Sequence, residues 1–87
     1  MARLLLIDHD PAVSLTLARM LEFRGHDVTR IESAETGLAH AIRTPPDALI
    51  LDMKMPEMGG LEFLRRLRTE PGHDTLPVGV ITGDYFL

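Results

Sequence analysis

Two acidic residues in this chain end apolar runs, and their positions predict a shared site. Asp8 follows residues 4–7, and Asp52 follows residues 48–51. Such runs are typical of strands in a parallel sheet, whose ligands bind beyond the carboxyl ends of the strands. Two carboxylates at one rim repel each other unless a cation or a shared proton lies between them. The pattern therefore predicts a rim at which Asp8 and Asp52 share a cation or a proton.

Apolar runs and turn residues alternate along the whole chain and predict the elements that position this rim. Strands are expected at residues 4–7, 27–31, 48–52 and 78–82. Three helices are expected between them, because each gap contains apolar residues at helical spacing. Strands that alternate with helices through short connections favour right-handed crossovers. The sequence therefore predicts an α/β fold with a parallel sheet and helices on both of its faces.

Each expected helix has a recognisable start. Asp10 is a candidate N-cap with Pro11 at the first helical position, and Gly25 is expected to end this helix. Ser33 is expected to cap the second helix, and Gly60 is expected to precede the third. The first helix starts directly after a strand, so its N-terminal amides lie at the predicted rim and favour anions there. The residues expected on the inner faces are Val13, Leu17, Met20 and Leu21, then Ala34, Leu38, Ala41 and Ile42, then Leu61, Leu64 and Leu67.

Composition narrows the class of protein. The chain has 87 residues, a formal net charge of -4 and no cysteine, which excludes disulfides and thiolate metal sites. Its 9 Lys and Arg residues are scattered and outnumbered by 13 acidic residues, so direct nucleic-acid binding by this segment is not expected. The first apolar run is too short for a signal-peptide core or a membrane span. A cytoplasmic protein without membrane association is the expectation.

Four stretches of the sequence carry a resemblance to a known family. They are DHDP at residues 8–11, PDALILDMKMP at 46–56, GGLE at 59–62, and residues 77–83. In this order and at these intervals they resemble the receiver domain of two-component response regulators, over all 87 residues. The resemblance implies a flavodoxin-like (CheY-like) parallel sheet with flanking helices, in the strand order 2-1-3-4. It also implies that residues 1–87 lack the fifth strand and last helices of the family, and are an incomplete receiver domain at the N-terminal end of a longer regulator.

The resemblance also implies roles for individual residues. Asp52 is the expected phosphoacceptor, which takes a phosphoryl group from the phosphohistidine of a histidine kinase or phosphotransfer protein. Thr82 matches the hydroxyl residue that turns toward the phosphoryl group. Asp8, Asp52 and the backbone carbonyl of Lys54 are the expected ligands of Mg²⁺, which prefers oxygen donors. The protein is then a phosphorylation-dependent switch that controls a downstream output, and not a turnover enzyme.

His9 departs from the family pattern. It stands where the family usually has a second acidic metal ligand, so we include it in the expected metal site. Imidazole is a poor ligand for Mg²⁺ and suits zinc, copper, nickel or iron better, so Mg²⁺ affinity is expected to fall or the metal preference to shift. The family also has a lysine after its fifth strand, and Lys54, the only lysine here, does not match it. The other histidines show no metal-ligand spacing and are expected in solvent: His26, His40 and His73.

Two other function classes remain open at this point. The first is a receiver-like interaction module that is not phosphorylated and acts by dimerisation through an uncovered sheet face. His9 and the absence of the family lysine favour it. The second is a small metal-dependent phosphatase or other hydrolase on a similar sheet. It is the weaker of the two, because no further general acid or base is evident near Asp52 and 87 residues leave little room for a substrate pocket.

Overall fold

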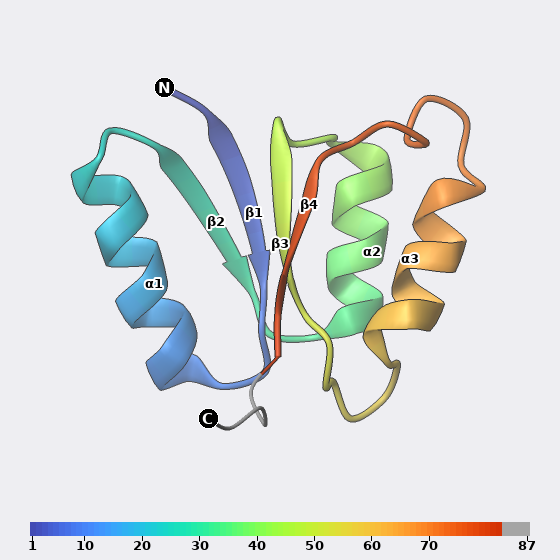
Figure 1. Cartoon of the computed structure of the whole chain (residues 1–87), viewed down its shortest axis with the longest axis horizontal. Helices are drawn as coiled ribbons and strands as arrows, with labels where there is room; N and C mark the ends of the chain where they lie inside the picture. The colour runs from blue at the N-terminus through green and yellow to red at the C-terminus, as the bar shows by residue number, and fades with distance from the viewer. Residues whose placement is uncertain (83–87) are drawn as a thin grey trace.

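A four-stranded parallel sheet with helices on both faces forms the domain in this computed structural model, which describes residues 1–82 (Figure 1). Its strand order is β2-β1-β3-β4, which confirms the predicted α/β class and the order 2-1-3-4. Gly83 and the apolar residues 85–87 lie outside the described residues. The elements are β1 (Arg3–Ile7), α1 (Pro11–Phe23), β2 (Asp27–Ile31), α2 (Ala34–Arg43), β3 (Ala48–Asp52), α3 (Gly60–Arg68) and β4 (Val78–Ile81).

Helices α1 and α2 begin where the sequence predicts, and α3 begins one residue earlier, at Gly60 itself. The Asp10 carboxylate accepts hydrogen bonds from the amides of Ala12 at 3.0 Å and Val13 at 3.3 Å, which caps α1. The Ser33 hydroxyl accepts from an amide of the first turn of α2. Gly25 follows α1 with a φ of 91°, a left-handed conformation that glycine adopts without steric cost. Within residues 1–82, no helix combines the length and apolar character that a membrane crossing needs.

The main core lies between the sheet and the α2–α3 layer. Leu49 and Leu51 of β3 and Phe63 and Leu67 of α3 are fully buried there. The expected inner position of Leu61 is wrong, since this side chain is 76% exposed. The buried stripe of α3 follows the spacing i, i+3, i+4, i+7 from Gly60, and Leu61 lies about 100° around the helix from the start of that stripe.

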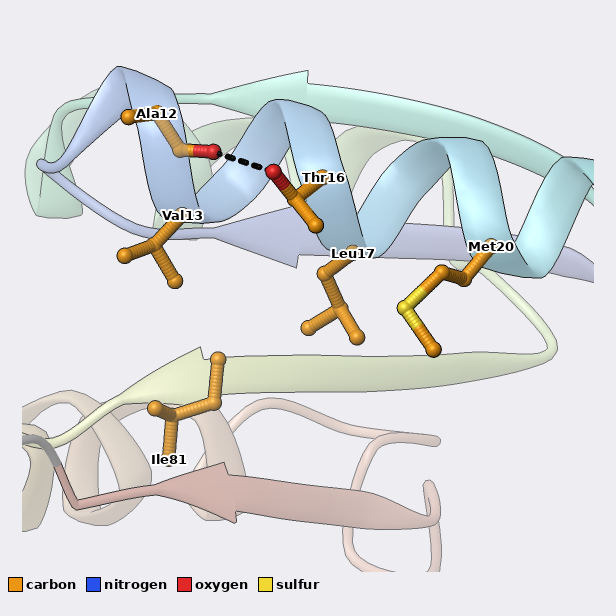
Figure 2. Close-up of a pocket in the computed structure, with 6 residues that line it drawn as sticks. All are labelled: Ala12, Val13, Thr16, Leu17, Met20 and Ile81. Carbon is orange, nitrogen blue, oxygen red and sulfur yellow. Dashed lines mark hydrogen bonds between the residues drawn. The ribbon is translucent and has the colours of Figure 1, made fainter.

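The expected inner face of α1 is also wrong in part. This helix packs on β2 and β1 through Ser14 and Ala18, which are buried. Met20, which we expected in the core, is 62% exposed, and Val13 is exposed as well. Figure 2 shows both side chains pointing from α1 toward the sheet, with Ile81 of β4 opposite them. Because no helix within residues 1–82 lies over β3 and β4 on this side, these side chains of α1 border an open apolar groove of about 460 Å³ (Figures 1 and 2).

Gly60 provides a test of the loop that closes the carboxyl edge of β3. Its amide donates to the Met53 carbonyl at 3.1 Å, and a Cβ on Gly60 would lie 2.9 Å from the Met53 Cα. We expect Gly60→Ala to lower the free energy of unfolding by about 1–3 kcal/mol, the usual cost of overpacking, measured by urea denaturation. Gly59→Ser is the matched control, because a Cβ there meets no atom within 4 Å and serine suits the N-cap. Equal stability of the two variants would contradict this account of Gly60.

Candidate functional site

The carboxyl ends of β1, β3 and β4 meet at one edge of the sheet and bring the predicted acidic residues together. Asp8 directly follows β1, and Asp52 is the last residue of β3. The parallel register pairs Ile7 with Leu51, and Asp52 with Ile81 of β4. The resulting cavity of about 400 Å³ is lined by Asp8, His9, Asp10, Val13, Asp52, Lys54 and Ile81.

Backbone amides orient the two carboxylates. Asp8 and Asp52 are only 2% and 5% exposed. The Asp10 amide donates to Asp8 Oδ1 at 2.9 Å, and the Lys54 amide donates to Asp52 Oδ1 at 2.9 Å. In both cases the donor lies two residues after the carboxylate, which is the short-range turn that aspartate side chains favour. Each carboxylate is therefore held by its own loop, with its second oxygen left for other partners.

Burial and mutual repulsion make this pair of anions electrostatically costly. Desolvation by burial raises the pKa of Asp8 above its ordinary value, and the neighbouring Asp52 carboxylate raises it further. The hydrogen bond from the Asp10 amide and the proximity of His9 act in the opposite direction, but the net shift is upward. A cation at this edge would relieve the repulsion.

His9 completes the cluster. Its Nδ1 lies 2.9 Å from Asp52 Oδ2 and 4.0 Å from Asp8 Oδ1, while the side chain stays 47% exposed. Ligand atoms of Asp8, His9 and Asp52 all lie within 4.8 Å of one another. Two buried carboxylates with an adjacent imidazole are a donor set that fits a divalent cation. The structure thus brings together the three side chains that we expected to bind metal.

Lys54 and Thr82 occupy the rim of the same edge. Lys54 lines the cavity, and its amide contact with Asp52 places its backbone beside the acidic cluster. Thr82 follows Ile81, the partner of Asp52 in the register, so it lies one residue past the end of β4. Its side chain is exposed and does not line the cavity. Of the cavity-lining residues, Val13 and Ile81 carried no sequence signal, because an apolar residue near a rim looks like any core residue.

His73 corrects the expectation that the remaining histidines are solvated. It is buried, with Nε2 3.1 Å from the Ala41 carbonyl and Nδ1 3.0 Å from the Pro71 carbonyl. Nδ1 of His40 is also buried, without a hydrogen-bond partner among the described residues. His73 therefore joins the α3–β4 connection to α2, which is a structural role remote from the acidic cluster.

The raised pKa of Asp8 predicts a pH-dependent difference in stability. The folded state binds this proton more tightly than the unfolded state, so ionisation of Asp8 costs stability as the pH rises from the ordinary Asp pKa through the raised value. Asp8→Asn keeps an Oδ1 for the Asp10 amide and does not ionise. We expect the free energy of unfolding of Asp8→Asn to rise relative to that of the native chain as the pH rises through this window. Urea denaturation from acidic to neutral pH, with a chelator present, measures it, and a pH-independent difference would contradict it.

Comparison with known proteins agrees with this geometry. The sequence pattern of the response regulator receiver domain matches residues 4–85. Protein PilH of Pseudomonas aeruginosa is 34% identical over 82 residues, which cover 94% of this chain and 68% of PilH. Response regulator MprA of Mycobacterium leprae is 41% identical over 80 residues, which cover 92% of this chain and 34% of MprA. The chain thus spans about two thirds of one curated relative and about one third of the other.

Solved structures share the fold. The N-terminal domain of a response regulator receiver protein from Methanoculleus marisnigri JR1 matches with a TM-score of 0.90 and 31% identity, over 100% of this chain and 71% of that chain. The receiver domain of the sensor histidine kinase PA1611 from Pseudomonas aeruginosa PAO1, which has a magnesium ion in its active site cleft, matches with a TM-score of 0.90. At 23% identity, over 95% of this chain and 68% of that chain, the second match bears on the fold alone. With the motif order, the strand order and the acidic edge in agreement, the chain belongs to the response regulator receiver domain family of two-component signalling, a family of signalling modules and not of enzymes.

Proposed function

We propose that this domain accepts a phosphoryl group on Asp52 and acts as the receiver of a two-component phosphorelay. The observation that carries the proposal is the position of Asp52, a buried carboxylate at the end of β3 that opens into a cavity beside a second carboxylate. The Lys54 amide holds Asp52 Oδ1 in place, so the carboxylate has one orientation in the cavity. An oriented carboxylate in a largely desolvated site is a suitable nucleophile for phosphoryl transfer.

The proposed reaction transfers the phosphoryl group from nitrogen to oxygen. A carboxylate oxygen of Asp52 attacks the phosphorus of a phosphohistidine, a P–O bond forms, and the P–N bond breaks with its electron pair on the departing imidazole. The donor is a histidine kinase or a phosphotransfer protein. Asp8, His9, Asp52 and the Lys54 carbonyl are the proposed ligands of a divalent cation, for which the sequence resemblance implies Mg²⁺. When bound, this cation neutralises the charge that gathers on the phosphoryl oxygens.

Thr82 and the partner domains complete the proposed switch. The phosphoryl group adds negative charge at the edge where Thr82 follows β4. We propose that the Thr82 hydroxyl then donates a hydrogen bond to a phosphoryl oxygen. The relatives extend well beyond the aligned region, since this chain covers only 34% of MprA. We therefore propose that residues 1–87 are the N-terminal portion of a longer regulator, whose remaining parts carry the output.

Incubation with acetyl phosphate, with Mg²⁺ in one series and Co²⁺ in a second, tests the acceptor directly. We expect intact-protein mass spectrometry to show one phosphoryl adduct, and peptide mapping to place it on Asp52. Asp52→Asn should abolish the adduct, because the amide is no longer a nucleophile although its oxygen still accepts the Lys54 amide. Asp27→Asn, at the amino end of β2 and remote from the cavity, should keep the full adduct. A folded native chain without an adduct in either series, or an adduct on another residue, would overturn the proposal.

A second candidate function, an interaction module that dimerises, rests on the apolar groove beside α1. Val13, Leu17 and Met20 face Ile81 across this groove (Figure 2). The adjacent strand β4 pairs only with β3 within residues 1–82, and its sequence, VGVI, contains no charge. The other edge strand, β2, carries charged residues, which disfavour pairing with another chain. A second copy of this chain could cover the free edge and the groove together.

Sedimentation analysis distinguishes this second candidate from a monomer. We expect a concentration-dependent dimer in the absence of phosphate. Val80→Lys, at a β4 position that is 52% exposed, should weaken the dimer by about tenfold or more, because a charge would lie at the paired edge. Leu61→Lys is the matched control, since Leu61 is exposed on α3, which packs on the face of the sheet opposite the groove. A monomer at all concentrations, or equal effects of both variants, would exclude dimerisation through this edge.

A further inference from the structure

The nitrogen donor of His9 sets this cluster apart from a site built from oxygen alone. Asp8 and Asp52 supply carboxylate oxygens, and the third side chain is an imidazole whose Nδ1 lies 2.9 Å from Asp52 Oδ2. Two acidic residues without this nitrogen would favour a hard cation that takes oxygen ligands. The identity of the third donor therefore decides which ion the cluster prefers.

The spacing of the donors suits one shared ion. Metal–nitrogen and metal–oxygen bonds of about 2.0–2.2 Å place neighbouring ligand atoms about 3 Å apart. The distance of 2.9 Å between His9 Nδ1 and Asp52 Oδ2 already matches that separation, and Asp8 Oδ1 lies 4.0 Å from the same nitrogen. The His9 side chain is 47% exposed, so a small rotation of the ring that brings it closer to Asp8 meets little packing resistance. Binding requires the neutral ring with its proton on Nε2, which leaves the Nδ1 lone pair for the metal.

We infer that the Asp8–His9–Asp52 cluster selects a first-row transition cation that accepts imidazole nitrogen, such as Co²⁺, Ni²⁺ or Zn²⁺, over Mg²⁺. This inference deepens the proposed function, because it names the ion class for the same cavity. Mg²⁺ is bound mainly through oxygen and releases its waters reluctantly, so replacing a water by imidazole gains little. Transition cations bind imidazole strongly, and their affinity for a given site generally rises from Mn²⁺ to Cu²⁺. Even with the Lys54 carbonyl as a fourth ligand, a six-coordinate ion keeps open positions, where phosphoryl oxygens can bind.

Competition between two metal ions tests the inference without a phosphoryl donor. The dissociation constants of Co²⁺ and Mg²⁺ are measured by calorimetry on the whole chain after metal removal, and Co²⁺ absorption reports whether a nitrogen ligand is present. We expect the native chain to bind Co²⁺ more tightly than Mg²⁺. In His9→Asp and in His9→Asn, the ratio of the two affinities should move toward Mg²⁺ by on the order of 10- to 100-fold, and the Co²⁺ spectrum should change.

Two His9 variants separate charge from donor chemistry. His9→Asp adds a negative charge and raises the affinity for every cation, whereas His9→Asn removes the imidazole without adding charge, so a fall in the Co²⁺ to Mg²⁺ ratio in both variants identifies the nitrogen. His26→Gln is the control for histidine outside the cavity and should leave the ratio unchanged. Equal or tighter binding of Mg²⁺ by the native chain, or an unchanged ratio in His9→Asn, would overturn the inference.

The outcome is independent of phosphorylation. If Asp52 fails to form an adduct with either Mg²⁺ or Co²⁺ while the affinity ratio responds to His9, the proposed phosphoacceptor function fails and the metal preference stands. If Asp52 is phosphorylated and the ratio of Co²⁺ to Mg²⁺ affinity does not change in the His9 variants, the proposed function stands and the metal inference fails. The two measurements therefore test separate properties of the same cavity.

Discussion

The close approach of two buried carboxylates is the constraint around which this domain is organised. Asp8 and Asp52 lie side by side because β1 and β3 are parallel neighbours that end at the same level of the sheet. Removing both anions from water is unfavourable, as the raised pKa of Asp8 indicates. The loop amides, the histidine and the cavity each compensate part of this cost. The concentration of negative charge that makes the two carboxylates repel each other also gives the site its attraction for a cation.

His9 offsets part of the cost of burying the two carboxylates, through a contact that a purely acidic edge would not have. Without a metal, its Nδ1 lies at hydrogen-bond distance from Asp52, so the histidine occupies an oxygen that a cation would otherwise take. Binding of a metal must exchange this contact for a coordination bond. The exchange therefore contributes less binding free energy for an ion that binds nitrogen weakly than for an ion that binds imidazole well. The same side chain therefore opposes one class of ions and assists the other.

The elements and the acidic edge could be predicted from the sequence, but the directions of several side chains could not. The starts at Asp10 and Ser33 were predictable because their hydrogen bonds are local. Leu61 was misplaced because it lies about 100° around α3 from the start of the buried stripe, which begins at Gly60. Met20 was misplaced because helical spacing identifies a stripe but not the surface that it meets, and no helix within residues 1–82 covers β3 and β4 on the α1 side. The contact between His9 and Asp52 spans 43 positions, and such a contact follows from the strand order rather than from any short motif.

The Met53 amide donates to the Ile81 carbonyl at 3.0 Å, and this bond ties the residue after Asp52 to the end of β4, an edge strand among the described residues. Edge strands fray more readily than central ones, because only one side of the ladder holds them. Whenever the end of β4 detaches, the loop that orients Asp52 loses an anchor at the same moment. The stability of the loop after Asp52 is therefore coupled to the pairing of β4 as well as to the core around Phe63.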